Sequence, residues 1–135
     1  MSEVRLIRGQ DLSEQTAQTP GMFRRTAIDN ATAGARSLWV GVVTVEPGAK
    51  TGAHHHGDCE SVVCVTGGHI RLRFGDRLEQ SVEAGPGDFV FIPSHLVHQE
   101  VNPSENEAVD SIVIRDCQDN TVIPVDLPHD LLREG

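Results

Sequence analysis

Short runs of apolar and β-branched residues alternate with Gly, Pro and Asp along most of this 135-residue chain. In residues 69–74, Ile70, Leu72 and Phe74 occupy every second position, which is the period of a β-strand. Turn residues separate such runs at intervals of roughly 8–12 residues, which is typical of an all-β sandwich or barrel. The pattern predicts strands over residues 22–28, 37–48, 61–66, 69–74, 78–82, 89–92, 109–114 and 121–125.

The spacing of these strands predicts a single all-β domain, a jelly-roll β-barrel, and the chain length suits one domain. Residues 1–20 are polar without a sustained period and are interpreted as an N-terminal arm. The barrel is expected to span residues 21–128, and residues 129–135 form a C-terminal tail near which one turn of helix is expected. A barrel of about eight strands encloses space for one small ligand.

The charge balance narrows the classes of partner. The net charge is −9, and residues 100–135 contain nine acidic side chains against two arginines. Such a surface repels phosphate backbones and anionic lipids, so neither nucleic acid nor a membrane is expected as a partner. No stretch approaches the roughly 20 apolar residues of a membrane span.

The N-terminal segment also lacks the apolar stretch of a secretory signal, so the expected compartment is the cytoplasm. There the three cysteines, Cys59, Cys64 and Cys117, are expected to stay reduced. Their odd number and the absence of a Cys-x-x-Cys pair argue against a disulfide framework and against a thiolate zinc site.

The histidine-rich segment 48–67 is the main candidate for chemistry. His54 and His56 share one side of an extended chain, whereas His55 faces the other. Gly57 and Asp58 can turn the chain, so that Glu60, on the next strand, can face the same space. Imidazoles with a carboxylate suit a divalent transition metal.

Two spacings resemble the signature motifs of the cupin family. Residues 48–67 read Gly-x5-His-x-His-x3-Glu-x6-Gly, and residues 87–102 read Gly-x5-Pro-x-His-x2-His-x3-Asn. The second motif usually has Gly where this chain has His95. The resemblance implies a jelly-roll barrel around one divalent metal, which could be Fe, Mn, Ni, Co, Cu or Zn. It implies four ligands: His54, His56, Glu60 and His98.

Four ligands on a six-coordinate metal leave two positions open, which is typical of a working metal rather than a structural one. Glu60 is then also the candidate catalytic base. Candidate pocket residues are Cys64, which shares parity with Glu60, and His95. Arg71 and Arg73 are candidates to clamp a substrate carboxylate. The commoner roles of such residues are a small buried hydrophobe for Cys64, solvated surface arginines and a loop histidine.

The chain has no tyrosine. This absence argues against the sugar epimerases of the superfamily, which resemble the fold but use a catalytic tyrosine. The first hypothesis is therefore a metal-dependent oxidoreductase of dioxygenase type acting on a small organic molecule. The alternatives are a metal-dependent isomerase or lyase of a sugar or sugar phosphate, and a non-catalytic sensor barrel. The apolar runs 37–43 and 61–65 further predict a homodimer.

Overall fold

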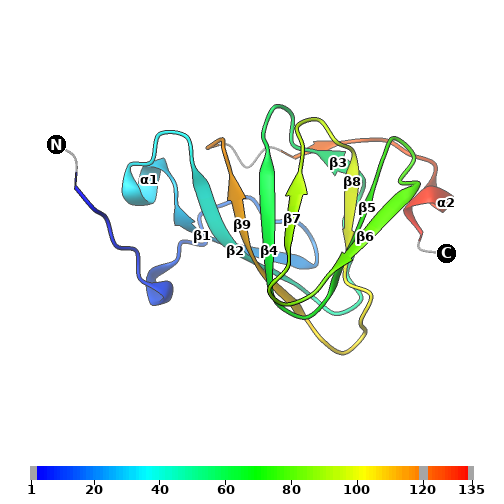
Figure 1. Cartoon of the computed structure of the whole chain (residues 1–135), viewed down its shortest axis with the longest axis horizontal. Coiled ribbons are helices and arrows are strands. Elements are labelled where there is room, and N and C mark those ends of the chain that lie inside the picture. The colour runs from blue at the N-terminus through cyan, green and yellow to red at the C-terminus, as the bar shows by residue number, and fades with distance from the viewer. Residues whose placement is uncertain (1–2, 119–121, 134–135) are drawn as a thin grey trace.

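Two antiparallel five-stranded sheets face each other in the computed structural model, which describes residues 3–118 and 122–133 (Figure 1). The first sheet has the spatial order β1 (Met22–Ile28), β2 (Trp39–Val45), β9 (Val109–Arg115), β4 (Ser61–Gly67) and β7 (Phe89–Ile92). The second has the order β10 (Ile123–Pro124), β3 (His54–His55), β8 (His98–Val101), β5 (Ile70–Phe74) and β6 (Gln80–Ala84). This architecture confirms the predicted all-β jelly-roll fold.

The core lies between the sheets because alternate residues of each strand face inward. In β2, Trp39, Val43 and Val45 are buried, and in β9 Val109 and Val113 are buried against them. Ile70 and Leu72 of β5 close the core from the other sheet. Each such side chain stabilises the fold by about 1.5–3 kcal/mol relative to an exposed position.

Most of the observed strands lie in predicted segments, with β1 and β7 at the expected residues, but β3 and β8, which carry His54 and His98, lie outside the predicted strand ranges. The return strand β6 begins at Gln80 rather than at residue 78, because Leu78 adopts a left-handed turn conformation (φ 55°). Of the strand predicted over 121–125, residue 121 lies outside the described residues, and β10 covers Ile123–Pro124.

Three short helical segments complete the described chain: η1 (Gly9–Asp11), α1 (Asn30–Ala33) and α2 (His129–Leu132), the last where a turn of helix was expected. The predicted N-terminal arm is in contact with the first sheet, since Ser13 forms an isolated bridge with Thr26 of β1. Among the described residues, no helix is long and apolar enough to cross a membrane.

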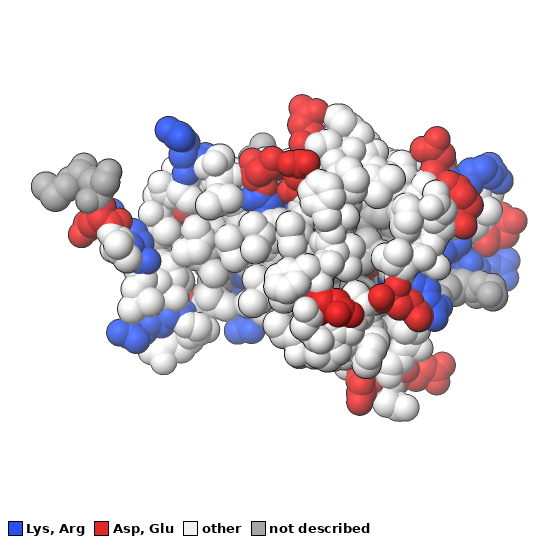
Figure 2. Space-filling view, in the orientation of Figure 1, with Lys and Arg blue, Asp and Glu red and all other residues white. Residues whose placement is uncertain are grey.

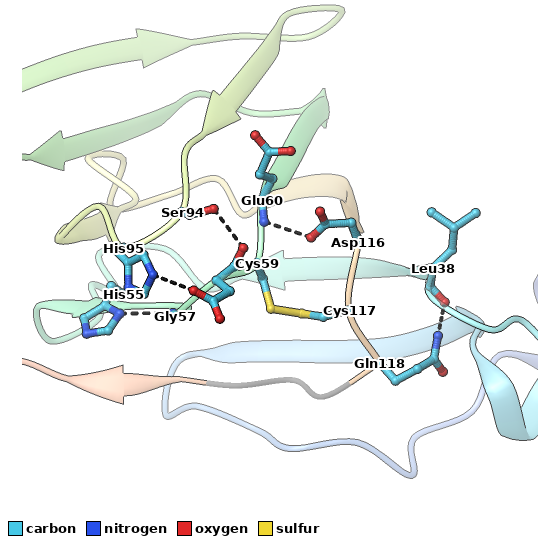
Figure 3. The surroundings of a disulfide bond; sticks show 11 residues. Leu38, His55, Gly57, Cys59, Glu60, Ser94, His95, Asp116, Cys117 and Gln118 are labelled. Atoms are coloured by element: carbon cyan, nitrogen blue, oxygen red, sulfur yellow. Dashed lines mark hydrogen bonds and ion pairs between the residues drawn. A yellow bond between two sulfur atoms is a disulfide. The ribbon is translucent and has the colours of Figure 1, made fainter.

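A disulfide joins Cys59 to Cys117, which contradicts the expectation that all three cysteines are reduced (Figure 3). The reason is the strand register: Ser61 of β4 pairs with Arg115 of β9, so the residues two positions beyond the ladder on each strand lie opposite each other. Their Cα atoms are 5.8 Å apart, within the usual range for a disulfide. Cys64 is a free, half-buried thiol.

Candidate metal centre

Three of the four predicted ligands come together inside the barrel. His54 of β3 pairs directly with His98 of β8, and His56 follows two residues after His54. The ring centroids lie 4.4–5.0 Å apart, and one ring nitrogen from each lies within 4.8 Å of the others. All three side chains are buried. The group could therefore hold one metal ion between its rings.

Hydrogen bonds fix the tautomers of two of these rings. His54 Nδ1 and His98 Nδ1 each lie 2.9 Å from a backbone carbonyl oxygen, of Gly52 and Leu96 respectively. Because a carbonyl only accepts, both Nδ1 atoms hold the proton and both Nε2 atoms present a lone pair. These two Nε2 atoms are buried without a hydrogen-bond partner. Buried polar atoms are rarely left unpaired, and this arrangement fits metal ligation with the second nitrogen held by the backbone.

Burial also keeps His98 in its neutral, metal-binding form. Desolvation lowers the pKa of the His98 ring below its ordinary value, because a charged imidazolium is disfavoured away from water. The site is therefore ready to bind a cation near neutral pH.

Glu100 supplies a buried carboxylate that the sequence reasoning missed. It follows His98 by two residues on β8, and its Oε1 lies 3.8 Å from His98 Nε2. Burial alone would raise the pKa of this carboxyl, but electrostatic interactions with His54, His98, His56 and the guanidinium of Arg24 lower it to about 2, so it is ionised. Its Oε2 has no hydrogen-bond partner. The two-residue spacing from His98 was the signal that could have identified it, because such a spacing puts both side chains on one side of an extended chain.

Glu60, the fourth predicted ligand, is not brought to the histidines. Its side chain is exposed, and its backbone N–H donates to Asp116 Oδ1 at 2.9 Å (Figure 3). The alternation along β4 is intact but inverted, since Ser61, Val63 and Val65 are buried instead. The turn at Gly57, with φ +60°, lies between His56 and β4. The alternation of side chains counted from His54 and His56 therefore cannot be extended across this turn to Glu60.

The same inversion places Cys64 on the outer face of the first sheet rather than in a pocket. Its cross-strand neighbours are Phe89 of β7 and Ile112 of β9, both exposed.

Arg71 and Arg73 of β5 lie on the side of their strand opposite the buried Ile70 and Leu72. Arg71 Nη2 forms an ion pair with Glu83 Oε1 at 2.6 Å, and Arg73 Nη1 donates to Gln99 Oε1 at 2.8 Å. Neither borders the interior cavity described below. The structure therefore does not place them as a substrate clamp.

His95 connects two loops at the end of the barrel. Its φ of +61° is the left-handed conformation that favours glycine, which explains why the second motif usually has Gly there. Its backbone N–H donates to the Gly57 carbonyl at 2.8 Å, and its Nε2 lies 2.7 Å from Asp58 Oδ1 (Figure 3). His95 thus holds the 57–58 turn and is outside the three-histidine group.

Beside the histidines lies a small interior cavity of about 20 Å³, enough for about one water. Its polar lining comes from His56, Ser61, Glu100, Ser111 and two buried arginines, Arg24 of β1 and Arg115 of β9. Both arginines were missed, although each falls at an inward position of its strand.

A second, larger space is an apolar groove of about 680 Å³ between the edge strands β6 and β7, a volume in the range of small-molecule sites. Phe74, Leu96 and Phe91 are among its walls. Ile92 borders both this groove and the interior cavity. Leu96, which lines the groove, also provides the backbone carbonyl that accepts from His98 Nδ1.

Comparisons with known proteins agree with this architecture. The profile of the Cupin domain matches residues 41–114. No curated protein sequence matches the chain. Among solved structures, the polyketide cyclase RemF from Streptomyces resistomycificus is similar with a TM-score of 0.76 and 23% identity, over 96% of this chain and 91% of that one.

Two further structures show the same fold. A sugar phosphate isomerase from Silicibacter pomeroyi has a TM-score of 0.61 and 24% identity, over 81% of this chain and 68% of that one. An oxalate oxidase has a TM-score of 0.67 and 19% identity, over 84% of this chain and 59% of that one. At these identities the similarity shows the fold alone.

Proposed function

The chain belongs to the cupin family, and on this premise we propose that it is a metal-dependent enzyme of dioxygenase type that acts on a small organic molecule. The observation that supports this most directly is the pair of buried, unpartnered Nε2 atoms of His54 and His98, whose Nδ1 atoms are fixed by carbonyls. His56 completes the ligand set. The metal would be one divalent ion of Fe, Mn, Ni, Co, Cu or Zn.

When bound, such a metal supplies Lewis-acid or redox chemistry at its open positions. The chain's own residues have three tasks. His54, His56 and His98 would hold the ion, and the ionised Glu100 beside His98 would balance part of its charge. The apolar groove between β6 and β7 binds the substrate's body and excludes water from it.

Oxygen consumption tests the reaction type. Protein loaded separately with Fe, Mn, Ni, Co, Cu or Zn is offered a panel of diketones, catechols and flavonols in an oxygen-electrode cell. We expect oxygen uptake with at least one metal and one substrate class, and none with the His98→Ala variant. No uptake with any loaded metal would contradict the dioxygenase assignment.

A second candidate is a non-oxidative conversion, such as ring closure or isomerisation, with the metal as a Lewis acid. The observation in its favour is the similarity to a polyketide cyclase over nearly the full length of both chains, together with a groove large and apolar enough for an aromatic compound. Turnover of an aromatic polyketide that continues under strict exclusion of oxygen, followed by mass spectrometry, would favour this candidate over the first.

We also propose that the protein is a homodimer that packs through the outer face of the first sheet. Two rows of apolar residues cross this face: Phe91, Val62, Ile114 and Val40 in one, and Phe89, Cys64, Ile112 and Val42 in the other. Phe89 and Phe91 are 72% and 57% exposed. Figure 2 shows few charged atoms over β2, β9 and β4. An uncharged apolar face of this kind is typical of a protein–protein interface.

The variant Ile114→Lys tests the interface, because it introduces a charge at the centre of one row. Light scattering at micromolar concentration should give twice the chain mass of 14.6 kDa for the parent protein and the single-chain mass for the variant. Leu6→Lys, which changes a more exposed apolar residue outside the sheet, should remain dimeric. A parent protein of 14.6 kDa would refute the dimer.

A further inference from the structure

Arg24 is a buried cation that interacts electrostatically with the buried Glu100 but forms no direct ion pair with it. Only 2% of the residue is exposed, and burial lowers its pKa, although an arginine remains charged at neutral pH. Its Nη1 donates to the Thr19 hydroxyl at 2.8 Å, and Nη2 lies 4.0 Å from the Met22 sulfur. No carboxylate of the described residues forms an ion pair with it. Glu100 is one carboxylate that interacts with two buried arginines, Arg24 and Arg115, so an excess of positive charge is buried beside it, and such a charge is costly to the fold.

Arg24 is one of the residues that line the interior cavity. Its Nε has no hydrogen-bond partner, and the same is true of the buried Ser61 hydroxyl, which borders the same cavity. Ser61 occupies the inward position at the start of β4, next to the exposed Glu60. Two unsatisfied groups, both able to donate, therefore border one small space beside His56.

The remaining polar lining favours an anion over a neutral ligand. Arg115 also borders the cavity, with its guanidinium 5.3 Å from the centre of the Trp39 ring. Glu100 is the one acidic residue among the described lining residues, and it interacts electrostatically with both arginines as well as with His98, so two cations face one carboxylate. An anion that entered near Arg24 would gain charge-assisted hydrogen bonds there.

We propose that Arg24 and Ser61 bind the carboxylate or enolate oxygen of an organic anion, whose apolar body lies in the groove between β6 and β7. This inference rests on the proposed function, since it names the substrate class of that site: a small apolar organic acid. Arg24 Nε–H and the Ser61 hydroxyl donate to the anion. Ile92, which borders both the cavity and the groove, lies where the head of the molecule joins its body.

The test compares acids with their neutral amides. Formate, acetate and benzoate, and the matching formamide, acetamide and benzamide, are titrated by calorimetry into metal-free and zinc-loaded protein. We expect the acids to bind both forms, benzoate tightest, and each amide to bind at least about tenfold more weakly. Arg24→Gln should weaken benzoate binding by at least about tenfold, and Ser61→Ala severalfold. Arg73→Gln, a change on the outer side of β5, should have no effect.

The variant Arg24→Lys separates a loss of binding from a loss of folding, because lysine keeps the positive charge but lacks the Nε–H donor. It should weaken benzoate binding while circular dichroism remains that of the parent. Equal binding of acids and amides, no binding of any acid to the parent, or parent-like benzoate binding by both Arg24 variants would overturn the proposal. Binding of acids to zinc-loaded protein alone would also overturn it, because the metal would then be the anion site, and the proposed function would survive. Acid binding by a protein that takes up no metal would support this inference and defeat the proposed function.

Discussion

Replacing His98 by alanine should reduce the metal content of the purified protein from close to one equivalent per chain to near zero. His98 is the most deeply buried of the three histidines, with no exposed surface, and its Nε2 forms no hydrogen bond. Changes in groups that merely support a ligand weaken metal affinity by about 10–100-fold, so loss of the ligand itself should cost more. Inductively coupled plasma mass spectrometry after dialysis measures the effect.

The decisive comparison is Glu60→Gln. The signature spacing assigns Glu60 to the metal, but the structure leaves it exposed and outside the histidine group. We therefore expect Glu60→Gln to retain the metal of the parent, as should His95→Ala, whose ring lies against Asp58. Metal loss in Glu60→Gln equal to that in His98→Ala would mean that the carboxylate turns inward when the ion binds, and the site described above would need Glu60 as a ligand.

The sequence correctly predicted that the three histidines come together, but not that Glu60 lies apart from them. The difference depends on the chain segments that connect these residues. His54 and His56 are separated by a single residue of extended chain, so alternation determines their common side. His98 follows from the spacing of the second motif. Between His56 and Glu60 the chain turns at Gly57, which adopts a left-handed conformation. Strand alternation cannot predict which way a side chain points after such a turn. Strand β4 begins beyond it with the Ser61 side chain facing inward.

The interior arginines were missed for a related reason. Strand β9 has apolar residues at most positions, and its exposed Ile112 and Ile114 look like core while the buried Arg115 looks like surface. Both faces of the first sheet are apolar, so hydrophobicity alone does not tell which side is inside. The buried cations Arg24 and Arg115 identify the inner face only once the sheet order is known.

The same sheet order explains the disulfide, which no feature of the cysteine spacing indicated. Cys59 and Cys117 are 58 residues apart in sequence and become opposite neighbours only through the β4–β9 register. Cys59 directly precedes Glu60, and Cys117 directly follows Asp116, whose carboxylate accepts from the Glu60 backbone N–H. The disulfide therefore fastens the start of β4 in the orientation that faces Ser61 inward and Glu60 outward.

Replacing Cys59 by serine should accordingly lower the free energy of unfolding by about 4 kcal/mol, the chain-entropy value for a closed loop of this length. Urea unfolding of oxidised protein measures it. Cys117→Ser should lose the same amount, and the double variant no more than either single variant, because one bond is removed in all three. The free energy of unfolding of Cys64→Ser, which removes the free thiol, should stay close to that of the parent.

Dithiothreitol should lower the free energy of unfolding of the parent to that of Cys59→Ser and leave that variant unchanged. A Cys59→Ser protein within about 1 kcal/mol of the parent would show that strand pairing alone, without the disulfide, determines the position of β4 beside the metal centre.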